Sequence, residues 1–164
     1  MESIKLLQDA GINFEELSDH GIDPMVFGDY LMTSGLIINH EIYWITFHGS
    51  YDFSYLYKVL KNDNLPNSLA KYQKFLKHLF PNIYDIKTMI DDMEKINNYS
   101  LNKLAEELSV DRHGASHQAG SDSLLTLQCF FALWNREFKD GIPVKYYNKI
   151  YGLNNEMEHG NVDF

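Results

Sequence analysis

The 164-residue sequence has a single cysteine, no apolar run of membrane-spanning length, and fewer basic than acidic residues. Cys129 cannot form an internal disulfide bond, which excludes a disulfide-stabilised domain and fits a reducing compartment. A membrane-spanning helix needs roughly 18 consecutive apolar residues, and no stretch approaches that length. Residues 1–10 also lack the basic segment and apolar core of a signal peptide. Repeats, linkers and low-complexity blocks are missing as well, which leaves one globular domain with one sizeable core.

The shortage of basic residues limits the functions that are open to the chain. Lys and Arg number 14 against 23 Asp and Glu, which gives a formal net charge of −9. A protein that holds a long nucleic acid by its backbone is normally basic. The balance therefore argues against a simple nucleic-acid binder. It is compatible with an enzyme whose carboxylates hold divalent metals and which grips a short end of a strand.

The spacing of apolar residues predicts an α/β domain in which helices surround a few short strands. The residues at 41–47 are β-branched and aromatic without alternation, which favours a strand covered on both faces. The segment at 119–138 is apolar nearly all round, which predicts a buried helix. The main predicted elements are strands at 41–47 and 82–85, and helices at 24–34, 53–60, 69–80, 86–96, 101–108, 119–138 and 144–151, ahead of a polar tail at 154–164.

Asp52 lies where the first predicted strand passes into a helix. Functional sites of open α/β sheets collect at the carboxyl ends of strands, so a carboxylate there is a candidate ligand. The plainer interpretation is that Asp52 is the N-cap of the helix that follows.

A second candidate site lies in the stretch of small residues from Ser116 to Thr126. His117 and Asp122 stand five residues apart, just ahead of the long apolar helix. Both reach one site only if His117 precedes the helix, and Gly120 would allow the required bend. A histidine beside a carboxylate suits general-base chemistry next to a bound cation. The alternative is a helix cap with a satisfied histidine.

These two stretches resemble motifs of a known family. Residues 44–53, with Tyr55 and Leu56, resemble one strand–helix block of the Caf/Pop deadenylases, which are DEDD-type ribonucleases and catalytic subunits of the CCR–NOT complex. Residues 117–126 resemble the last motif of that family. Shorter matches fall in the family's order at 21–23, 31–35, 83–85 and 151–153. The resemblance covers about residues 2 to 153.

The resemblance implies an RNase H-like fold, a mixed sheet flanked by helices. It implies a 3′–5′ exoribonuclease that shortens mRNA poly(A) tails and releases 5′-AMP. Asp52 and Asp122 would be ligands of two Mg²⁺ (or Mn²⁺) ions, and His117 would be the general base. Implied partners are the poly(A) 3′ end and the scaffold and second deadenylase subunits of the CCR–NOT complex, in cytoplasm and nucleus and away from membranes.

One family motif is missing from the sequence. The family's first strand carries Asp-x-Glu, which supplies two further ligands, and we expect it ahead of residue 1 together with the early strands. Residues 1–153 would then be the C-terminal part of a single DEDD ribonuclease domain that lacks the N-terminal strands of its sheet. The Asp-x-Glu formed by Asp92 and Glu94 falls on a predicted helix, where the two side chains point apart, so it is interpreted as solvated surface.

Five further residues are candidate RNA contacts on the basis of their places near the two motifs: His48, Tyr51, Arg112, His113 and Ser121. His48 has a structural role at the strand end as its alternative. Tyr51 and Tyr55 are candidates for stacking on bases, whereas Phe53 fits the apolar stripe and is expected to be core.

Three functional hypotheses follow. The first is an exoribonuclease of the Caf/Pop type, and the second is a truncated or degenerate copy that acts as an interaction module of the deadenylase complex. A third, a DEDD exonuclease acting on DNA or structured RNA, is disfavoured by the length of the match around Asp52. If the chain is active by itself, Asp85 is the first carboxylate to consider as a replacement ligand, because it follows a strand.

Overall fold

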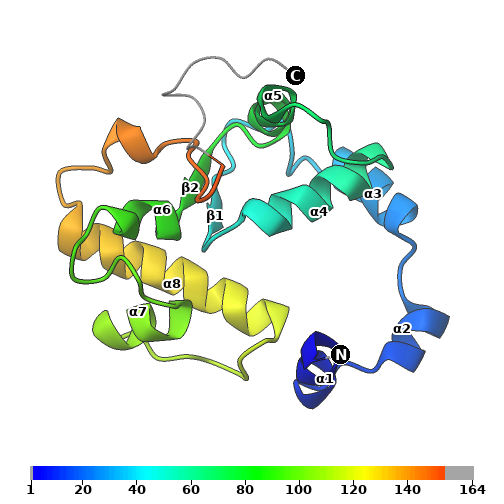
Figure 1. The fold of residues 1–164 in the computed structure, drawn as a ribbon, viewed down its shortest axis with the longest axis horizontal. Coiled ribbons are helices and arrows are strands. Elements are labelled where there is room, and N and C mark those ends of the chain that lie inside the picture. The colour runs from blue at the N-terminus through cyan, green and yellow to red at the C-terminus, as the bar shows by residue number, and fades with distance from the viewer. Residues whose placement is uncertain (1, 154–164) are drawn as a thin grey trace.

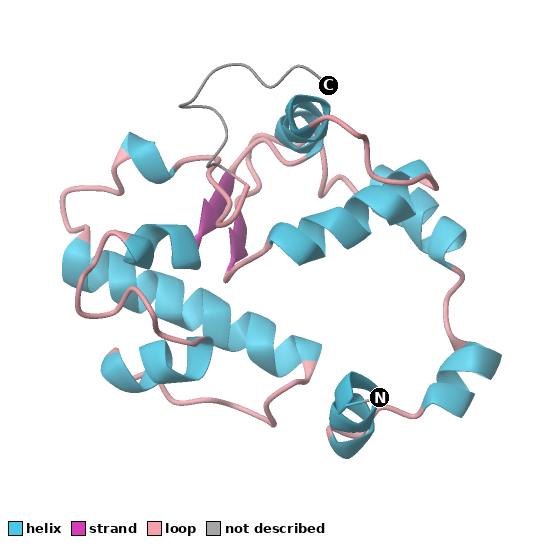
Figure 2. Cartoon of the chain, in the orientation of Figure 1, coloured by secondary structure: helices cyan, strands magenta, loops and turns pink. Residues whose placement is uncertain are grey.

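The computed structural model describes residues 2–153 as helices around a small central sheet (Figures 1 and 2). It confirms the predicted α/β class, with the sheet much smaller than the helical part. None of the helices in this described range is long and apolar enough to cross a membrane. The elements are α1 (Glu2–Asp9), α2 (Phe14–His20), α3 (Pro24–Thr33), β1 (Trp44–Thr46), α4 (Ser50–Lys61), α5 (Leu69–Leu79), β2 (Ile83–Asp85), α6 (Ile86–Asp91), α7 (Leu101–Glu107), α8 (Ala119–Glu137) and the 3₁₀ helix η1 (Val144–Tyr146).

The sheet consists of β1 and β2, which run parallel with Trp44 opposite Ile83 and Thr46 opposite Asp85. Helices α4 and α5 form the crossover between the two strands. Successive residues of a strand point to opposite faces. Accordingly, Trp44 and Ile83 pack on one side of the sheet, and Ile45 and Tyr84 pack on the other.

Each face of the sheet carries its own hydrophobic core. One core lies among α3, α4 and α5 and includes the fully buried side chains of Phe53 and Phe80. The other lies among α6, α7 and α8 and includes Leu104, Leu125 and Leu133. The prediction that Phe53 belongs to the core is confirmed. The sheet thus lies between two helical layers.

Helix α8 departs from the prediction that it is buried all round. Its face toward β1 and α7 is buried and includes Cys129, whose burial was predicted and raises the pKa of the thiol to about 11. A stripe on another face is exposed, because no described element packs there. We call this set the α8 stripe: Leu124, Leu127, Phe131 and Trp134.

Two predicted helices are shorter than their apolar spacing suggests. The segment at 86–96 is helical only in α6, and turns follow it. The segment at 144–151 is reduced to η1, because Asn148 leaves the helix to pair with β2. Its backbone N–H donates to the Ile83 carbonyl at 3.0 Å, and its side-chain oxygen accepts from the Ile83 N–H at 2.9 Å. The predicted polar tail at 154–164 lies outside the described residues.

Candidate functional site

The turn between β1 and α4 has a backbone that only particular residues can adopt. His48 lies in the left-handed region with φ of 61°. A Cβ atom on Gly49 would lie 2.7 Å from the Cβ of Thr46, a distance that real contacts do not show. Glycine is therefore required at the position where the chain leaves the strand and starts α4.

Asp85, at the end of β2, binds the backbone of this turn through hydrogen bonds. Its side chain is fully buried, and its two oxygens accept backbone N–H groups from His48 at 2.8 Å, Gly49 at 2.9 Å, Lys87 at 2.9 Å and Tyr151 at 3.3 Å. These donors engage both carboxylate oxygens. Asp85 is therefore a structural carboxylate in this fold, and its geometry does not support the role of a replacement metal ligand.

Asp52 lies in the first turn of α4, and its side chain is exposed. The N-cap of α4 is Gly49, so the alternative interpretation of Asp52 as the N-cap is wrong. The carboxylate nevertheless stands near the positive end of the helix dipole, which stabilises a negative charge there. Asp52 therefore lies just after β1, and its carboxylate makes no capping hydrogen bond to α4.

Asp122 lies in the first turn of α8, and the loop ahead of it brings His117 to the start of the same helix. The expected bend falls at His117 itself, with φ of 65°, whereas Gly120 is inside the helix. Gln118 is the N-cap, so the cap interpretation of the His–Asp pair is wrong. The left-handed backbone at His117 turns the chain into α8 and leaves the imidazole exposed.

The three predicted catalytic residues line one cleft of about 610 Å³. Asp52 comes from α4, Asp122 from α8 and His117 from the connecting loop. The lining also includes Trp44, Ile45 and Thr46, so the cleft runs along the whole of β1. The structure therefore gathers side chains that are up to 70 residues apart in sequence, which their order in the chain alone does not reveal.

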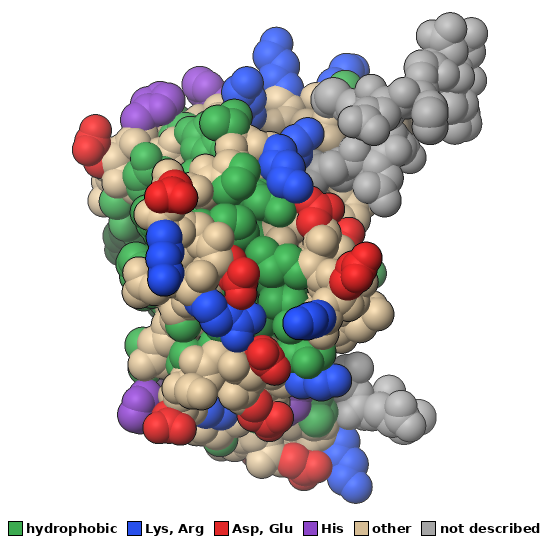
Figure 3. Space-filling model, turned by 90° about the vertical axis from the view of Figure 1, so that its left-hand side faces the viewer, with side chains coloured by type: hydrophobic (Ala, Val, Ile, Leu, Met, Phe, Trp, Pro, Cys, Tyr) green, Lys and Arg blue, Asp and Glu red, His purple; other side chains and the backbone are tan. Residues whose placement is uncertain are grey.

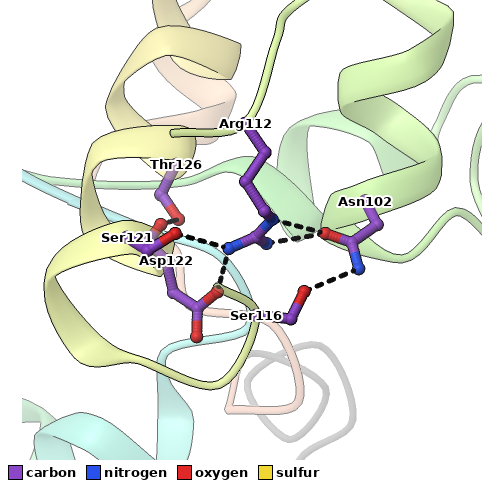
Figure 4. Close-up of polar contacts among 6 residues, drawn as sticks. All are labelled: Asn102, Arg112, Ser116, Ser121, Asp122 and Thr126. Atoms are coloured by element: carbon purple, nitrogen blue, oxygen red, sulfur yellow. Dashed lines mark hydrogen bonds and ion pairs between the residues drawn. The ribbon is translucent and has the colours of Figure 1, made fainter. Parts of the chain in front are cut away.

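Arg112 forms an ion pair with the Asp122 carboxylate in this cleft (Figure 4). Arg112 Nη1 lies 2.7 Å from Asp122 Oδ1 and 2.9 Å from Ser121 Oγ. On its other side, Nη2 and Nε of Arg112 donate to Asn102 Oδ1 of α7 at 2.6 and 3.2 Å. Asn102 was not singled out from the sequence, which carries no local signal linking it to a partner ten residues away.

The candidate RNA contacts do not share one environment. Arg112 lines the cleft, and Ser121 accepts its hydrogen bond. Tyr51 is 73% exposed at the start of α4, and His113 is also exposed. The ring of His48 contacts Tyr151 edge-on at 5.0 Å between ring centres, which supports the structural alternative for this residue. Their contacts with RNA stay predictions.

The donor types in the cleft fit a hard divalent cation, because Mg²⁺ and Mn²⁺ prefer carboxylate oxygens. Their number is small. Within residues 2–153 no group of three or more His, Cys, Asp and Glu side chains is close enough to hold a metal ion. Asp92 and Glu94 are exposed, and Asp92 pairs with Lys145, as expected for solvated surface. Asp52 and Asp122 therefore fit as part of a metal site.

Charged side chains of both signs lie on the surface of the molecule. On the face drawn in Figure 3, acidic and basic side chains alternate around a band of apolar ones. That face offers no continuous basic surface for a phosphate backbone.

Comparison with known proteins places the chain among ribonucleases. Residues 32–130 match the CAF1 family ribonuclease. The chain is 42% identical over 161 residues to the probable CCR4-associated factor 1 homolog 7 of Arabidopsis thaliana, covering 98% of this chain and 57% of that protein. It is 41% identical over 152 residues to the poly(A) ribonuclease pop2 of Schizosaccharomyces pombe, covering 93% of this chain and 45% of that protein.

Solved structures agree with this result. The Mg²⁺- and Mn²⁺-bound form of S. pombe Pop2p matches with a TM-score of 0.85 and 41% identity, covering 92% of this chain and 60% of that one. The yeast NOT1 MIF4G domain co-crystallised with CAF1 gives a match with a TM-score of 0.77 and 36% identity, covering 86% of this chain and 58% of the other. These neighbours confirm the predicted RNase H-like fold. The chain spans about half the length of the curated relatives it matches. Its sequence and fold together show that the chain belongs to the CAF1 family of ribonucleases.

Proposed function

We propose that this chain supplies one half of the active site of a 3′–5′ exoribonuclease that shortens poly(A) tails and releases 5′-AMP. The observation that carries the proposal is the single cleft lined by Asp52, Asp122 and His117 in a chain of the CAF1 family. The three residues are those that the sequence motifs assigned to metal binding and proton transfer.

Each residue has a distinct role in this proposal. Asp52 and Asp122 would each offer carboxylate oxygens to divalent ions, two Mg²⁺ or Mn²⁺ in a complete site. When bound, such ions supply stabilisation of the negative charge that develops on a phosphate. His117, exposed at the end of its loop, would accept the proton of the attacking water, since the unprotonated nitrogen of an imidazole can act as a general base.

The names of the relatives support this reaction and its setting. A Pop2p structure contains Mg²⁺ and Mn²⁺, and the pop2 protein is described as a poly(A) ribonuclease. The structure of a NOT1 MIF4G domain with CAF1 supports a scaffold subunit of the CCR–NOT complex as a partner. We extend the proposal to a second deadenylase subunit and to action in cytoplasm and nucleus.

A second candidate function is an interaction module without catalysis. It is favoured by the ion pair of Asp122 with Arg112 and by the lack, in the described range, of any group of three or more His, Cys, Asp and Glu side chains that could hold a metal ion. Such a module would keep the scaffold-binding surface and lose the chemistry.

The test is to supply the missing ligands. An N-terminal extension that carries an Asp-x-Glu strand is fused to the chain, and the product is incubated with a 5′-labelled oligoadenylate and Mg²⁺ or Mn²⁺. We expect stepwise shortening from the 3′ end, which D52N, D122N or H117A abolishes. D92N is the matched control, because Asp92 is an exposed acidic residue outside the cleft. A folded fusion that leaves the oligonucleotide intact would favour the interaction module.

A further inference from the structure

The Arg112 side chain lies between α7 and α8 and makes hydrogen bonds to side chains of both helices (Figure 4). It is only 19% exposed, against 37% for Asp122. Its Nη1 atom holds Asp122 and Ser121 on α8, while its remaining nitrogens hold Asn102 on α7. A mostly buried guanidinium needs such partners, because an unpaired buried charge is strongly unfavourable.

Arg112 is also the positive charge of the cleft. Among the lining residues that the structure describes, it is the one Lys or Arg, and it shares the cleft with Asp52 and Asp122. It takes Oδ1 of Asp122, and no described residue donates a hydrogen bond to Oδ2. A divalent ion bound to this carboxylate would share it with the guanidinium, and the two positive charges would repel each other.

We infer that Arg112 is an internal counter-cation of Asp122, which competes with a divalent ion for this carboxylate. The inference rests on the proposed function in one respect, that Asp122 is a metal ligand. Arg112 neutralises the carboxylate while the metal is absent and lowers the affinity of the site for the metal. It is a positioning residue and takes no part in the chemical step.

The surroundings of Arg112 allow it to release Asp122. Asn102 Oδ1 already accepts two of its N–H groups, and Ser121 Oγ accepts a third. These neutral acceptors stay in place when the carboxylate turns to a metal ion, so the guanidinium is not left without partners. The network thus holds the arginine beside the site in both conditions.

Competition and a purely structural role predict opposite results for R112Q. If Arg112 only holds the loop and the helices in place, its removal disorganises Asp122 and weakens metal binding. If it competes, its removal strengthens metal binding even though the metal-free protein becomes less stable. Metal affinity and metal-free stability therefore have to be measured on the same variants.

The experiment is a Mn²⁺ titration of the metal-free 164-residue chain at constant ionic strength. Mn²⁺ binding is measured through its effect on the relaxation rate of water protons. Thermal unfolding without metal is recorded in parallel. We expect R112Q to bind Mn²⁺ about 2- to 5-fold more tightly than the unmodified chain, the upper part of the range for loss of a partly exposed ion pair. R112K, which keeps the charge, should bind close to the unmodified chain.

Two controls isolate the effect. R136Q is the same substitution at the chain's other arginine, on the last turn of α8, where it pairs with Glu107 and Glu137. It should leave Mn²⁺ affinity unchanged. In a D122N background, R112Q should also have no effect.

Equal or weaker Mn²⁺ binding by R112Q would overturn the inference, and so would a failure of R112Q to bind Mn²⁺ at all. The Mn²⁺ measurement does not depend on RNA hydrolysis. Tighter binding by R112Q together with an inactive extended protein would therefore support the inference and contradict the proposed function.

Discussion

Asp85 joins three segments of the chain through backbone hydrogen bonds: the turn after β1, the start of α6 and the segment at Tyr151. Because this turn places the first residues of α4, a buried side chain whose hydrogen-bond partners lie outside the cleft lining helps to set the position of Asp52. At the scale of single residues, the site is built by such indirect supports as much as by its own side chains.

D85N tests this support. The amide offers one acceptor oxygen where the carboxylate has two, and its NH₂ group faces backbone donors. We expect a loss of about 2–4 kcal/mol in the free energy of unfolding, measured with urea, since buried donors lose their acceptor. The matched control is D92N, whose ion pair with Lys145 is more than half exposed on both sides and should change stability by less than about 1 kcal/mol. Equal losses for the two variants would contradict the support assigned to Asp85.

The residues of the site differ in how far the sequence could reveal them. Asp52 stands out because it follows a strand, and Asp122 and His117 because they precede a long apolar helix among small residues. The roles of Asn102 and Asp85 depend on tertiary contacts, which no local pattern records. The interpretation of Asp52 as a cap failed because Gly49 is the cap, and only the backbone path shows that.

At the scale of elements, α8 is the main departure from the prediction. Its composition is apolar on nearly every side, but in the described structure only the face toward β1 and α7 is covered. Apolar composition shows that a surface can be buried; it does not identify the element that covers it. The α8 stripe and the β1 strand, which pairs only with β2 in the described structure, both remain available to a further segment.

Two neighbouring phenylalanines on α8 test which face is packed. Phe130 is 3% exposed and Phe131 is 51% exposed. F130A should lower the free energy of unfolding by about 3–5 kcal/mol, the usual cost of emptying a core site. F131A is the matched control, and it should cost less than about 1 kcal/mol in the monomeric chain. Both values come from urea unfolding at low protein concentration. A large loss for F131A would show that the α8 stripe is covered in solution.

At the scale of the whole molecule, the small number of metal-ligand side chains weakens the binding of metal ions, and the acidic net charge weakens the binding of RNA. Two Mg²⁺ ions bring four positive charges, and such ions are held mainly by carboxylates and substrate phosphate. Among the residues that the structure describes, the cleft lining offers the carboxylates of Asp52 and Asp122, and Arg112 already neutralises Asp122. With a net charge of −9, the chain gains little general attraction to RNA to offset that shortage.

We therefore expect the 164-residue chain by itself to have little or no nuclease activity, although it belongs to a ribonuclease family. Metal affinity should be low, and the second ion should be lost first, because each missing carboxylate removes charge that the ions need.

The open side of β1 should also make the chain marginally stable, so an extension that pairs with it should raise both its melting temperature and its turnover. The measurement is the shortening of a 5′-labelled oligoadenylate with Mg²⁺ or Mn²⁺, with and without that extension. Robust stepwise shortening by the unextended chain, abolished by D122N, would show that Asp52 and Asp122 suffice. Since Asp85 is fully engaged by backbone N–H groups, it would not be the source of the remaining ligands.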